Sequence, residues 1–188
     1  QAIERFCREH DILLCFDEMQ AGFGRTGTLF GYMHYEVEPD LLCCGKGMSS
    51  SMPLSCVLGS QAVMDLPDVG SMSSTHSANP LSCAAGLATM EALIEDQILE
   101  KSAVLSDLLF KRLNKLQLTF PELIHSIQGK GMVAALIFHQ NSSCNVSDIA
   151  KNVCYDCLRN GLLVVCTNRE SIKLAPPLTI SKDALEEG

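Results

Sequence analysis

The chain has 188 residues, 47% of them hydrophobic, which is enough to bury a sizeable core as one domain or two small ones. Its formal net charge of -8 argues against nucleic acid or an anionic membrane surface as a partner. No apolar run reaches the roughly 18 residues that cross a bilayer, and the first residues are not signal-like. The sequence therefore predicts a cytoplasmic protein.

The ten cysteines are predicted to be buried free thiols rather than a disulfide framework, because most lie inside apolar runs and no secretory signal is visible. Cys154 and Cys157 form a C-x-x-C pair on a predicted helix, but without a second pair it predicts no metal site. The cysteines in apolar runs are Cys15, Cys43, Cys44, Cys56, Cys83 and Cys166.

The first elements are predicted to be a helix over residues 2–10 and two buried strands. The apolar run over residues 12–16 is typical of a buried parallel strand and leads into Asp17. After a glycine-rich loop and a turn, a second run over residues 41–44 leads into a glycine and Lys46. Two strands thus deliver two ionisable residues at their carboxyl ends.

A third short strand is predicted over residues 53–59. Asn79 as N-cap and Pro80 at the first helical position then begin a strong helix that runs to about Glu95.

The rest of the chain is predicted to be a long helix followed by strands with one further helix. The long helix has one buried face, formed by Ile98, Leu105, Leu108, Leu109, Leu113 and Leu116. Strands are expected over 124–128, 132–138, 162–166 and 171–174, with a helix over 147–160 closed by Gly161 and a last helix capped by Ser181.

Two features bound the organisation of the chain. Gln1 rather than Met stands first, within a predicted helix, so we expect a fragment of a longer protein. The change of pattern after the alanine-rich helix predicts a domain boundary near residue 95, between residues 1–95 and 96–188.

Asp17 and Lys46 are the candidate chemical groups, because ligands of open parallel sheets bind beyond the carboxyl ends of the strands. Lys46 is the only lysine in the first hundred residues and stands among Gly, Met and Ser, which solvate an ammonium group poorly. We expect its pKa to fall below about 10.4, which makes a nucleophilic amine. A nearby carboxylate can keep a pyridine nitrogen protonated. Each residue alone is equally consistent with a turn or surface role.

Several motifs in order resemble the signature of class III (omega) aminotransferases. Asp17 and Lys46 are 29 residues apart, as are Lys46 and Thr75, which matches the family pattern. The motifs are LLCFDEMQAGFGRTG at 13–27, HY at 34–35, PD at 39–40, KG at 46–47, MPL at 52–54 and STHSANPL at 74–81.

The resemblance implies a role for each matching residue. Asp17 would pair with the pyridine nitrogen of pyridoxal 5'-phosphate, Gln20 would hydrogen-bond its 3-oxygen, and Met19 would pack on the ring. Lys46 would form the Schiff base with the cofactor and then shuttle a proton. Thr75 would reach the phosphate of the neighbouring subunit's cofactor, so a homodimer is implied.

The resemblance also implies a fold and a reaction. The fold is α/β: residues 1–95 would be the C-terminal part of a mostly parallel-sheet, cofactor-binding large domain, and residues 96–188 a truncated α+β small domain. The reaction is transfer of an amino group from an amine or omega-amino acid to a 2-oxo acid, 2-oxoglutarate or pyruvate. The chain covers under half of a family member, so we expect it to be inactive alone.

Two residues depart from the family pattern. Met19 stands where Ile, Val or Ala is usual. Lys173, in the segment that resembles the family's substrate-carboxylate site, stands where many members have arginine, which grips a carboxylate with two parallel hydrogen bonds. Lys173 is equally consistent with a solvated charge at a strand end.

Other interpretations remain at this stage. Gly22 to Gly27 match G-x-G-x-x-G, the phosphate loop of NAD-binding dehydrogenases, but five residues separate this loop from the strand, and little room is left for the required helix. A non-catalytic interaction module would explain the fold without the chemistry. An aminomutase or decarboxylase of the same family would use the same cofactor residues.

Overall fold

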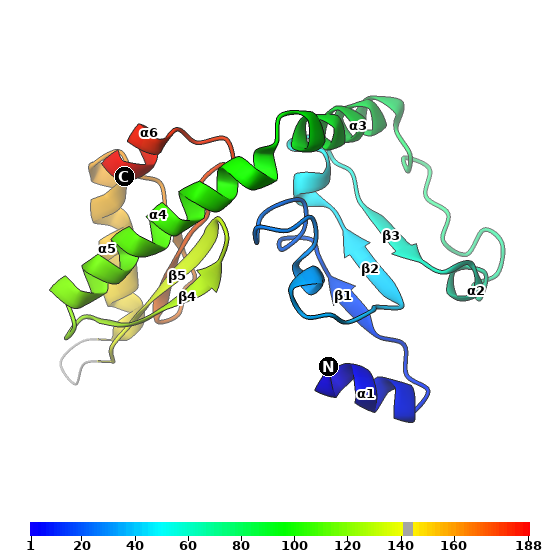
Figure 1. Cartoon of the computed structure of the whole chain (residues 1–188), viewed down its shortest axis with the longest axis horizontal. Helices are drawn as coiled ribbons and strands as arrows, with labels where there is room; N and C mark the ends of the chain where they lie inside the picture. Colours follow the sequence, from blue (N-terminus) through cyan, green and yellow to red (C-terminus); the bar gives the residue numbers. More distant parts are fainter. Residues whose placement is uncertain (141–144) are drawn as a thin grey trace. The chain divides into compact units, whose positions relative to one another are not determined.

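The computed structural model describes residues 1–140 and 145–188, which form two compact units, residues 1–99 and 100–188. Each unit contains its own sheet (Figure 1). The sequence placed a boundary near residue 95; that these units are domains of the complete protein stays a prediction.

The first unit contains a three-stranded sheet of order β1-β2-β3. Its strands β1 (Cys15–Asp17) and β2 (Leu41–Cys44) are parallel, whereas β3 (Cys56–Gly59) is antiparallel to β2. The expected mostly parallel sheet is therefore wrong for the β2–β3 pair. A parallel strand usually needs a crossover helix, and the connection over residues 45–55 contains only the short 3-10 helix Lys46–Met48.

Helices precede and follow this sheet. The first unit has α1 (Ala2–Glu9), the short α2 (Gln61–Met64), which the sequence did not predict, and α3 (Pro80–Glu95). As the sequence predicted, the Asn79 side chain caps α3 by accepting a hydrogen bond from Leu81 N at 3.0 Å. Two 3-10 helices, η1 (Gly31–His34) and η2 (Lys46–Met48), lie in the loops that follow β1 and β2.

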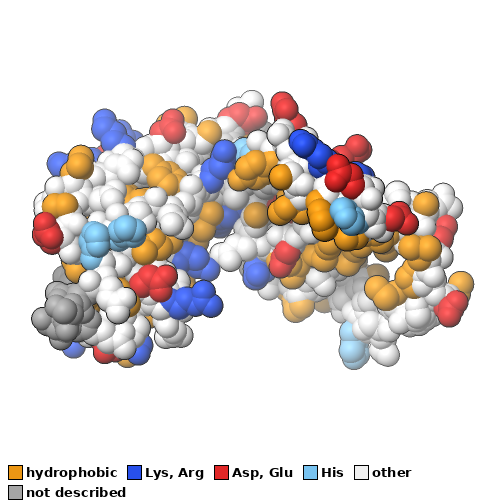
Figure 2. Space-filling view, turned by 90° about the horizontal axis from the view of Figure 1, so that it is seen from below, with side chains coloured by type: hydrophobic (Ala, Val, Ile, Leu, Met, Phe, Trp, Pro, Cys, Tyr) orange, Lys and Arg blue, Asp and Glu red, His pale blue; other side chains and the backbone are white. Residues whose placement is uncertain are grey.

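The predicted buried strand over residues 12–16 is only partly correct. The strand starts at Cys15, and Ile12 and Leu13 remain 47% and 48% exposed. Figure 2 shows apolar side chains at the surface in several places. An apolar run alone does not make a strand, because its backbone also needs a neighbouring strand as hydrogen-bond partner.

The second unit contains an antiparallel sheet of order β4-β5-β7-β6. Its elements follow the predicted order, although β6 is much shorter than the predicted strand over 162–166. They are α4 (Ile98–Thr119), β4 (Ile124–Lys130), β5 (Val133–Phe138), α5 (Val146–Arg159), β6 (Val165–Cys166), β7 (Ser171–Leu174) and α6 (Lys182–Glu187).

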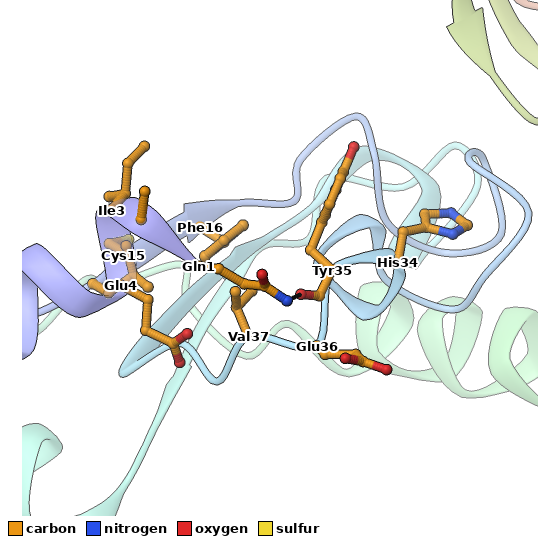
Figure 3. A pocket seen from close by; sticks show the side chains of 11 residues that line it. Gln1, Ile3, Glu4, Cys15, Phe16, His34, Tyr35, Glu36 and Val37 are labelled. Carbon is orange, nitrogen blue, oxygen red and sulfur yellow. Dashed lines mark hydrogen bonds between the residues drawn. The ribbon is translucent and has the colours of Figure 1, made fainter.

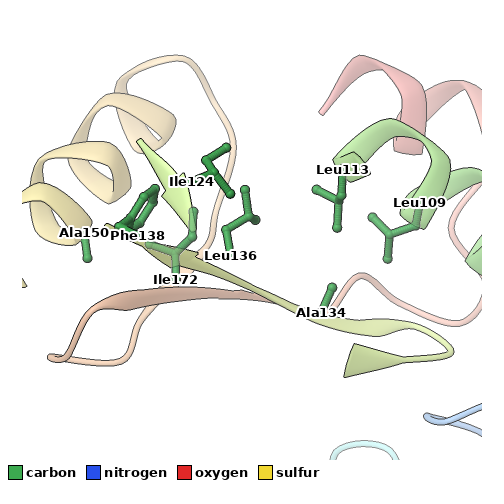
Figure 4. Packing of buried hydrophobic residues seen from close by; sticks show 8 residues of the cluster. All are labelled: Leu109, Leu113, Ile124, Ala134, Leu136, Phe138, Ala150 and Ile172. Carbon is green, nitrogen blue, oxygen red and sulfur yellow. The ribbon is translucent and has the colours of Figure 1, made fainter. Parts of the chain in front are cut away.

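The core of this unit lies between one face of the sheet and the helices α4 and α5 (Figure 4). Every second residue of β5 is buried, as expected for a strand with one covered face. The buried cluster comprises Leu109, Leu113, Ile124, Ala134, Leu136, Phe138, Ala150 and Ile172. None of the described helices is long and apolar enough to cross a membrane.

Leu136→Ala tests this core. Removal of a fully buried leucine side chain leaves a cavity, so we expect the free energy of unfolding to fall by about 2–5 kcal/mol. Leu118→Ala is the control, since Leu118 is 82% exposed on α4. Urea unfolding of the two variants checks the prediction, and an equal loss in both would contradict it.

Candidate functional site

The carboxyl ends of β1 and β2 lie side by side. The parallel register pairs Asp17 with Cys43, and the backbone N–H of Glu18 donates to the Cys43 carbonyl at 2.9 Å. Lys46 follows β2 after a single glycine and begins η2. The chain segments that carry Asp17 and Lys46 therefore reach the same edge of the sheet, as the sequence predicted from the two apolar runs.

The turn after β1 exposes two of the predicted cofactor residues. The Asp17 carboxylate accepts a hydrogen bond from the backbone N–H of Met19 at 3.0 Å, which shapes this turn locally. Asp17 and Gln20 are exposed, and Met19 is half-buried. Polar side chains that could meet a ligand thus stand at the strand end.

Met19 joins this turn to the segment that carries Lys46. A Cβ atom at Gly45 would lie 2.6 Å from Met19 Cε and 2.7 Å from its Sδ, so the thioether lies directly against the backbone of Gly45. Gly45 directly precedes Lys46, so the end of the Met19 side chain lies beside the segment that carries the lysine. Met19, Gly45 and Lys46 are therefore brought together.

Lys46 lies in an unusual backbone conformation. Its φ of 44° is in the left-handed region, which few residues other than glycine adopt without strain. Such strain is often found at functional positions and persists only where the surrounding structure imposes it. Within the described residues its side chain is exposed, whereas the sequence analysis expected a poorly solvated neighbourhood.

Glu18 is a structural residue of the site that the sequence analysis missed. It is 2% exposed, and its two carboxylate oxygens accept hydrogen bonds from the backbone N–H groups of Gly31 and Tyr32, both at 2.8 Å. The alternation of side chains along a strand could have predicted that Glu18 points inward, because it follows Asp17 and faces the opposite side. Glu18 therefore fixes the loop between β1 and β2 from behind.

Asp40 holds the starts of the two strands together. Its carboxylate accepts the N–H of Leu14 at 2.7 Å and receives Arg8 Nη1 at 2.7 and 2.8 Å. The Leu14 N–H first, and the Arg8 guanidinium second, keep the pKa of Asp40 below its usual value. This contact gives a physical role to the Pro39-Asp40 motif.

The glycine-rich loop does not form a dinucleotide cradle. The segment between β1 and β2, residues 18–40, contains turns and the 3-10 helix η1 but no α-helix. Gly24 and Gly27 have positive φ values of 89° and 95°, as tight turns require. A pyrophosphate would therefore find no helix N-terminus there.

Two other predicted residues belong to other segments of the chain. Thr75 is exposed in the segment between α2 and α3, where Ser77 Oγ donates to the Ser74 carbonyl at 2.7 Å. Lys173 lies in the second unit, within β7, where it is flanked by Ala135 of β5 and Val165 of β6. Its side chain is partly exposed one residue before the end of β7, and its substrate role stays a prediction.

A pocket of about 760 Å³ lies near the first strand but does not include Asp17 or Lys46 (Figure 3). It is lined by α1, β1 and residues 34–37, and the Gln1 amide donates to the Tyr35 carbonyl there at 3.4 Å. We assign the candidate site from the strand ends, because Asp17 and Lys46 both lie at that edge of the sheet and neither lines this pocket.

The cysteines are free thiols wherever the structure describes them, but few are fully buried. Of the six expected in the interior only Cys44 is, whereas Cys15 and Cys83 are exposed. Cys15 lies on the open face of β1, and Cys83 lies on an exposed side of α3. Residues 1–140 and 145–188 contain no group of three His, Cys, Asp or Glu side chains suited to a metal ion.

Comparison with known proteins places this chain in a family. The model of the family "Aminotransferase class-III" matches residues 1–188. A probable mitochondrial ornithine aminotransferase of Caenorhabditis elegans is 34% identical over 100% of this chain and 42% of its own length. A leucine/methionine racemase of Thermococcus litoralis is 35% identical over 99% of this chain and 42% of its own length.

A solved structure is similar in fold as well. The acetylornithine aminotransferase from Elizabethkingia anophelis has a TM-score of 0.88 and 34% identity, over 98% of this chain and 45% of that protein. The chain belongs to the class III aminotransferase family, whose aminotransferases depend on pyridoxal 5'-phosphate. It spans under half the length of these relatives.

Glu18→Gln tests the support behind the strand edge. The amide keeps one acceptor oxygen but loses the charge and the second acceptor, so we expect the free energy of unfolding to fall by about 1–3 kcal/mol. Glu9→Gln is the matched control, since Glu9 is exposed on α1. Chemical unfolding of both variants measures the difference, and equal stabilities would show that the two Glu18 hydrogen bonds are not needed.

Proposed function

We propose that the complete protein is a pyridoxal-phosphate-dependent aminotransferase in which Lys46 binds the cofactor covalently. It would move an amino group from an amine or omega-amino acid to a 2-oxo acid, 2-oxoglutarate or pyruvate. The observation that carries the proposal is the parallel pairing of β1 and β2, which ends at Asp17 and leads directly to Lys46. Membership of the class III family supports it.

The residues at the strand edge fit the chemistry of this cofactor. A carboxylate suits the protonated nitrogen of its ring, an amide suits the ring oxygen, and a primary amine suits its aldehyde. Asp17, Gln20 and Lys46 supply these three groups, and all three side chains are exposed at this edge. When bound, the cofactor supplies an electron sink that stabilises negative charge on the substrate's alpha carbon.

Each of these side chains would have a separate task. The Asp17 carboxylate would keep the ring nitrogen protonated, and Gln20 would orient the ring through its oxygen. Met19, held against Gly45, would pack on one face of the ring. Lys46 Nζ would take the proton from the substrate's alpha carbon as a general base. It would then give this proton to the C4' carbon of the cofactor as a general acid.

Two parts of the proposal concern groups outside the strand edge. Thr75 would reach the cofactor phosphate of a second copy of the protein, so the working form would be a homodimer. Its exposure in the segment before α3 supports such a contact. Lys173 would bind the substrate carboxylate through its single ammonium group, without the two parallel hydrogen bonds that an arginine forms. A cytoplasmic location also stays a prediction.

Related reactions of the same cofactor are the main alternative to transamination. An aminomutase or decarboxylase would use the same groups, and one relative is named as a racemase. A panel of amines and 2-oxo acids given to the complete protein separates them, because only a transaminase yields a new amino acid from the acceptor. A folded protein that takes up no pyridoxal phosphate would instead be an interaction module.

Covalent labelling tests the assignment of Lys46. We expect borohydride reduction of the complete protein with pyridoxal phosphate to leave the pyridoxyl mass on the peptide that contains Lys46. Lys46→Arg should abolish this label, whereas Lys101→Arg, at the next lysine in the sequence, should keep it. Mass spectrometry of the digest locates the label, and label on another lysine would refute the assignment.

Asp17→Asn tests the proposed partner of the ring nitrogen. The amide keeps the size of the side chain but removes its charge, so we expect cofactor binding to persist while turnover falls by roughly 100-fold or more. Asp11→Asn serves as the control, since Asp11 is exposed in the turn before β1. Absorbance of the bound cofactor and steady-state rates provide the two measurements, and near-normal turnover of Asp17→Asn would exclude this role.

A further inference from the structure

Three sulfur atoms gather directly behind the segment that carries Lys46. Cys44, the last residue of β2, is paired with Cys56, the first residue of β3, in the antiparallel ladder. Cys56 Sγ lies 3.8 Å from the Sδ of Met48, which belongs to η2. Neither cysteine is oxidised in this structure.

The register allows a disulfide between Cys44 and Cys56. Directly opposed residues of an antiparallel pair have Cα atoms about 4.5–5.5 Å apart, and disulfides span Cα separations of about 4.4–6.8 Å. The two cysteines are direct partners in this register. Their side chains could therefore be joined without a shift of either strand.

A second thiol pair in the same sheet serves as a comparison. Cys15 Sγ and Cys43 Sγ lie 3.7 Å apart, but Cys15 is paired with Leu41, so Cys43 is two residues out of register. With strands about 4.8 Å apart and a rise of about 3.3 Å per residue, this offset gives a Cα separation of roughly 8 Å. That separation exceeds what a disulfide spans, although the thiols touch.

We propose that Cys44 and Cys56 are an oxidation site that forms a reversible disulfide with a peroxide as oxidant. Cys56 is the partly exposed member and meets the peroxide first, whereas Cys44 is 1% exposed and acts second. Burial, and secondly the neighbouring Cys56, raise the pKa of Cys44 to about 11, which is consistent with this order.

The chemistry balances in two steps. The Cys56 thiolate attacks one peroxide oxygen, the O–O bond breaks, and the leaving hydroxide takes a proton to give water and a sulfenic acid. The Cys44 sulfur then attacks the Cys56 sulfur, the S–O bond breaks, and the oxygen leaves as a second water. Two thiols are oxidised to one disulfide while one hydrogen peroxide is reduced to two waters, and an added dithiol reverses the bond.

The bond would close the loop of residues 45–55, which contains Lys46 and η2. Fewer conformations would then be open to this loop. The consequence for Lys46 rests on the proposed function: a lysine that must reach both cofactor and substrate would react more slowly from a closed loop. The site would thus couple peroxide exposure to the reactivity of Lys46.

The experiment treats the complete protein with hydrogen peroxide, blocks the remaining thiols by alkylation and digests it without reduction. We expect mass spectrometry to find a peptide pair linked through Cys44 and Cys56 that dithiothreitol separates. Cys56→Ser and Cys44→Ala should abolish this link, and Cys15→Ser should keep it. A link between Cys15 and Cys43, or oxidation of Cys56 without any link, would overturn the proposal.

Labelling with pyridoxal phosphate and cyanoborohydride, which reduces the Schiff base but leaves disulfides intact, tests the consequence before and after oxidation. We expect labelling of Lys46 to slow by roughly threefold or more in the oxidised protein, and to recover after reduction by dithiothreitol, because the closed loop has less freedom. An unchanged rate in a linked protein would overturn the coupling to Lys46. Absence of label from Lys46 in the fully reduced protein would refute the proposed function instead. The disulfide is tested separately, by the mass of the linked peptide pair.

Discussion

The parallel register of β1 and β2 is the constraint on which the candidate site depends. Asp17 is paired with Cys43, and Lys46 follows three residues later. A slip by one residue would turn the Asp17 side chain to the opposite face relative to β2. The long connection between these strands contains no regular helix to set the register, so side-chain contacts must do so. Asp40 fixes the strand starts through Leu14.

The alternating directions of strand side chains divide the work between neighbouring residues. Asp17 is exposed at the edge, while Glu18 points inward and binds the backbone of Gly31 and Tyr32. Glu18 therefore holds the loop between β1 and β2, which leaves the exposed Asp17 carboxylate available for a ligand. Met19 then closes the turn against Gly45, so the position of Lys46 depends on packing as well as on hydrogen bonds.

Much of this arrangement could be predicted from the sequence, because apolar runs mark strands and helix caps mark helix starts. The order of elements and the delivery of Asp17 and Lys46 to one edge followed from those signals. Strand lengths and the direction of β3 did not, since both depend on which backbone groups find partners. The exposure of Lys46 was also missed, because walls around a residue come from distant segments and not from its sequence neighbours.

Successive residues of β2 face different surroundings. Cys43 contacts Cys15 on the face that holds Asp17, whereas Cys44 lies on the opposite face and pairs with Cys56. Both thiols have a sulfur neighbour, yet only the second pair is in register. Contact between two thiols therefore does not by itself define a redox site; the backbone separation set by the ladder does. The β1–β2 register thus keeps Cys15 and Cys43 too far apart to be joined, whereas the β2–β3 register places Cys44 opposite Cys56.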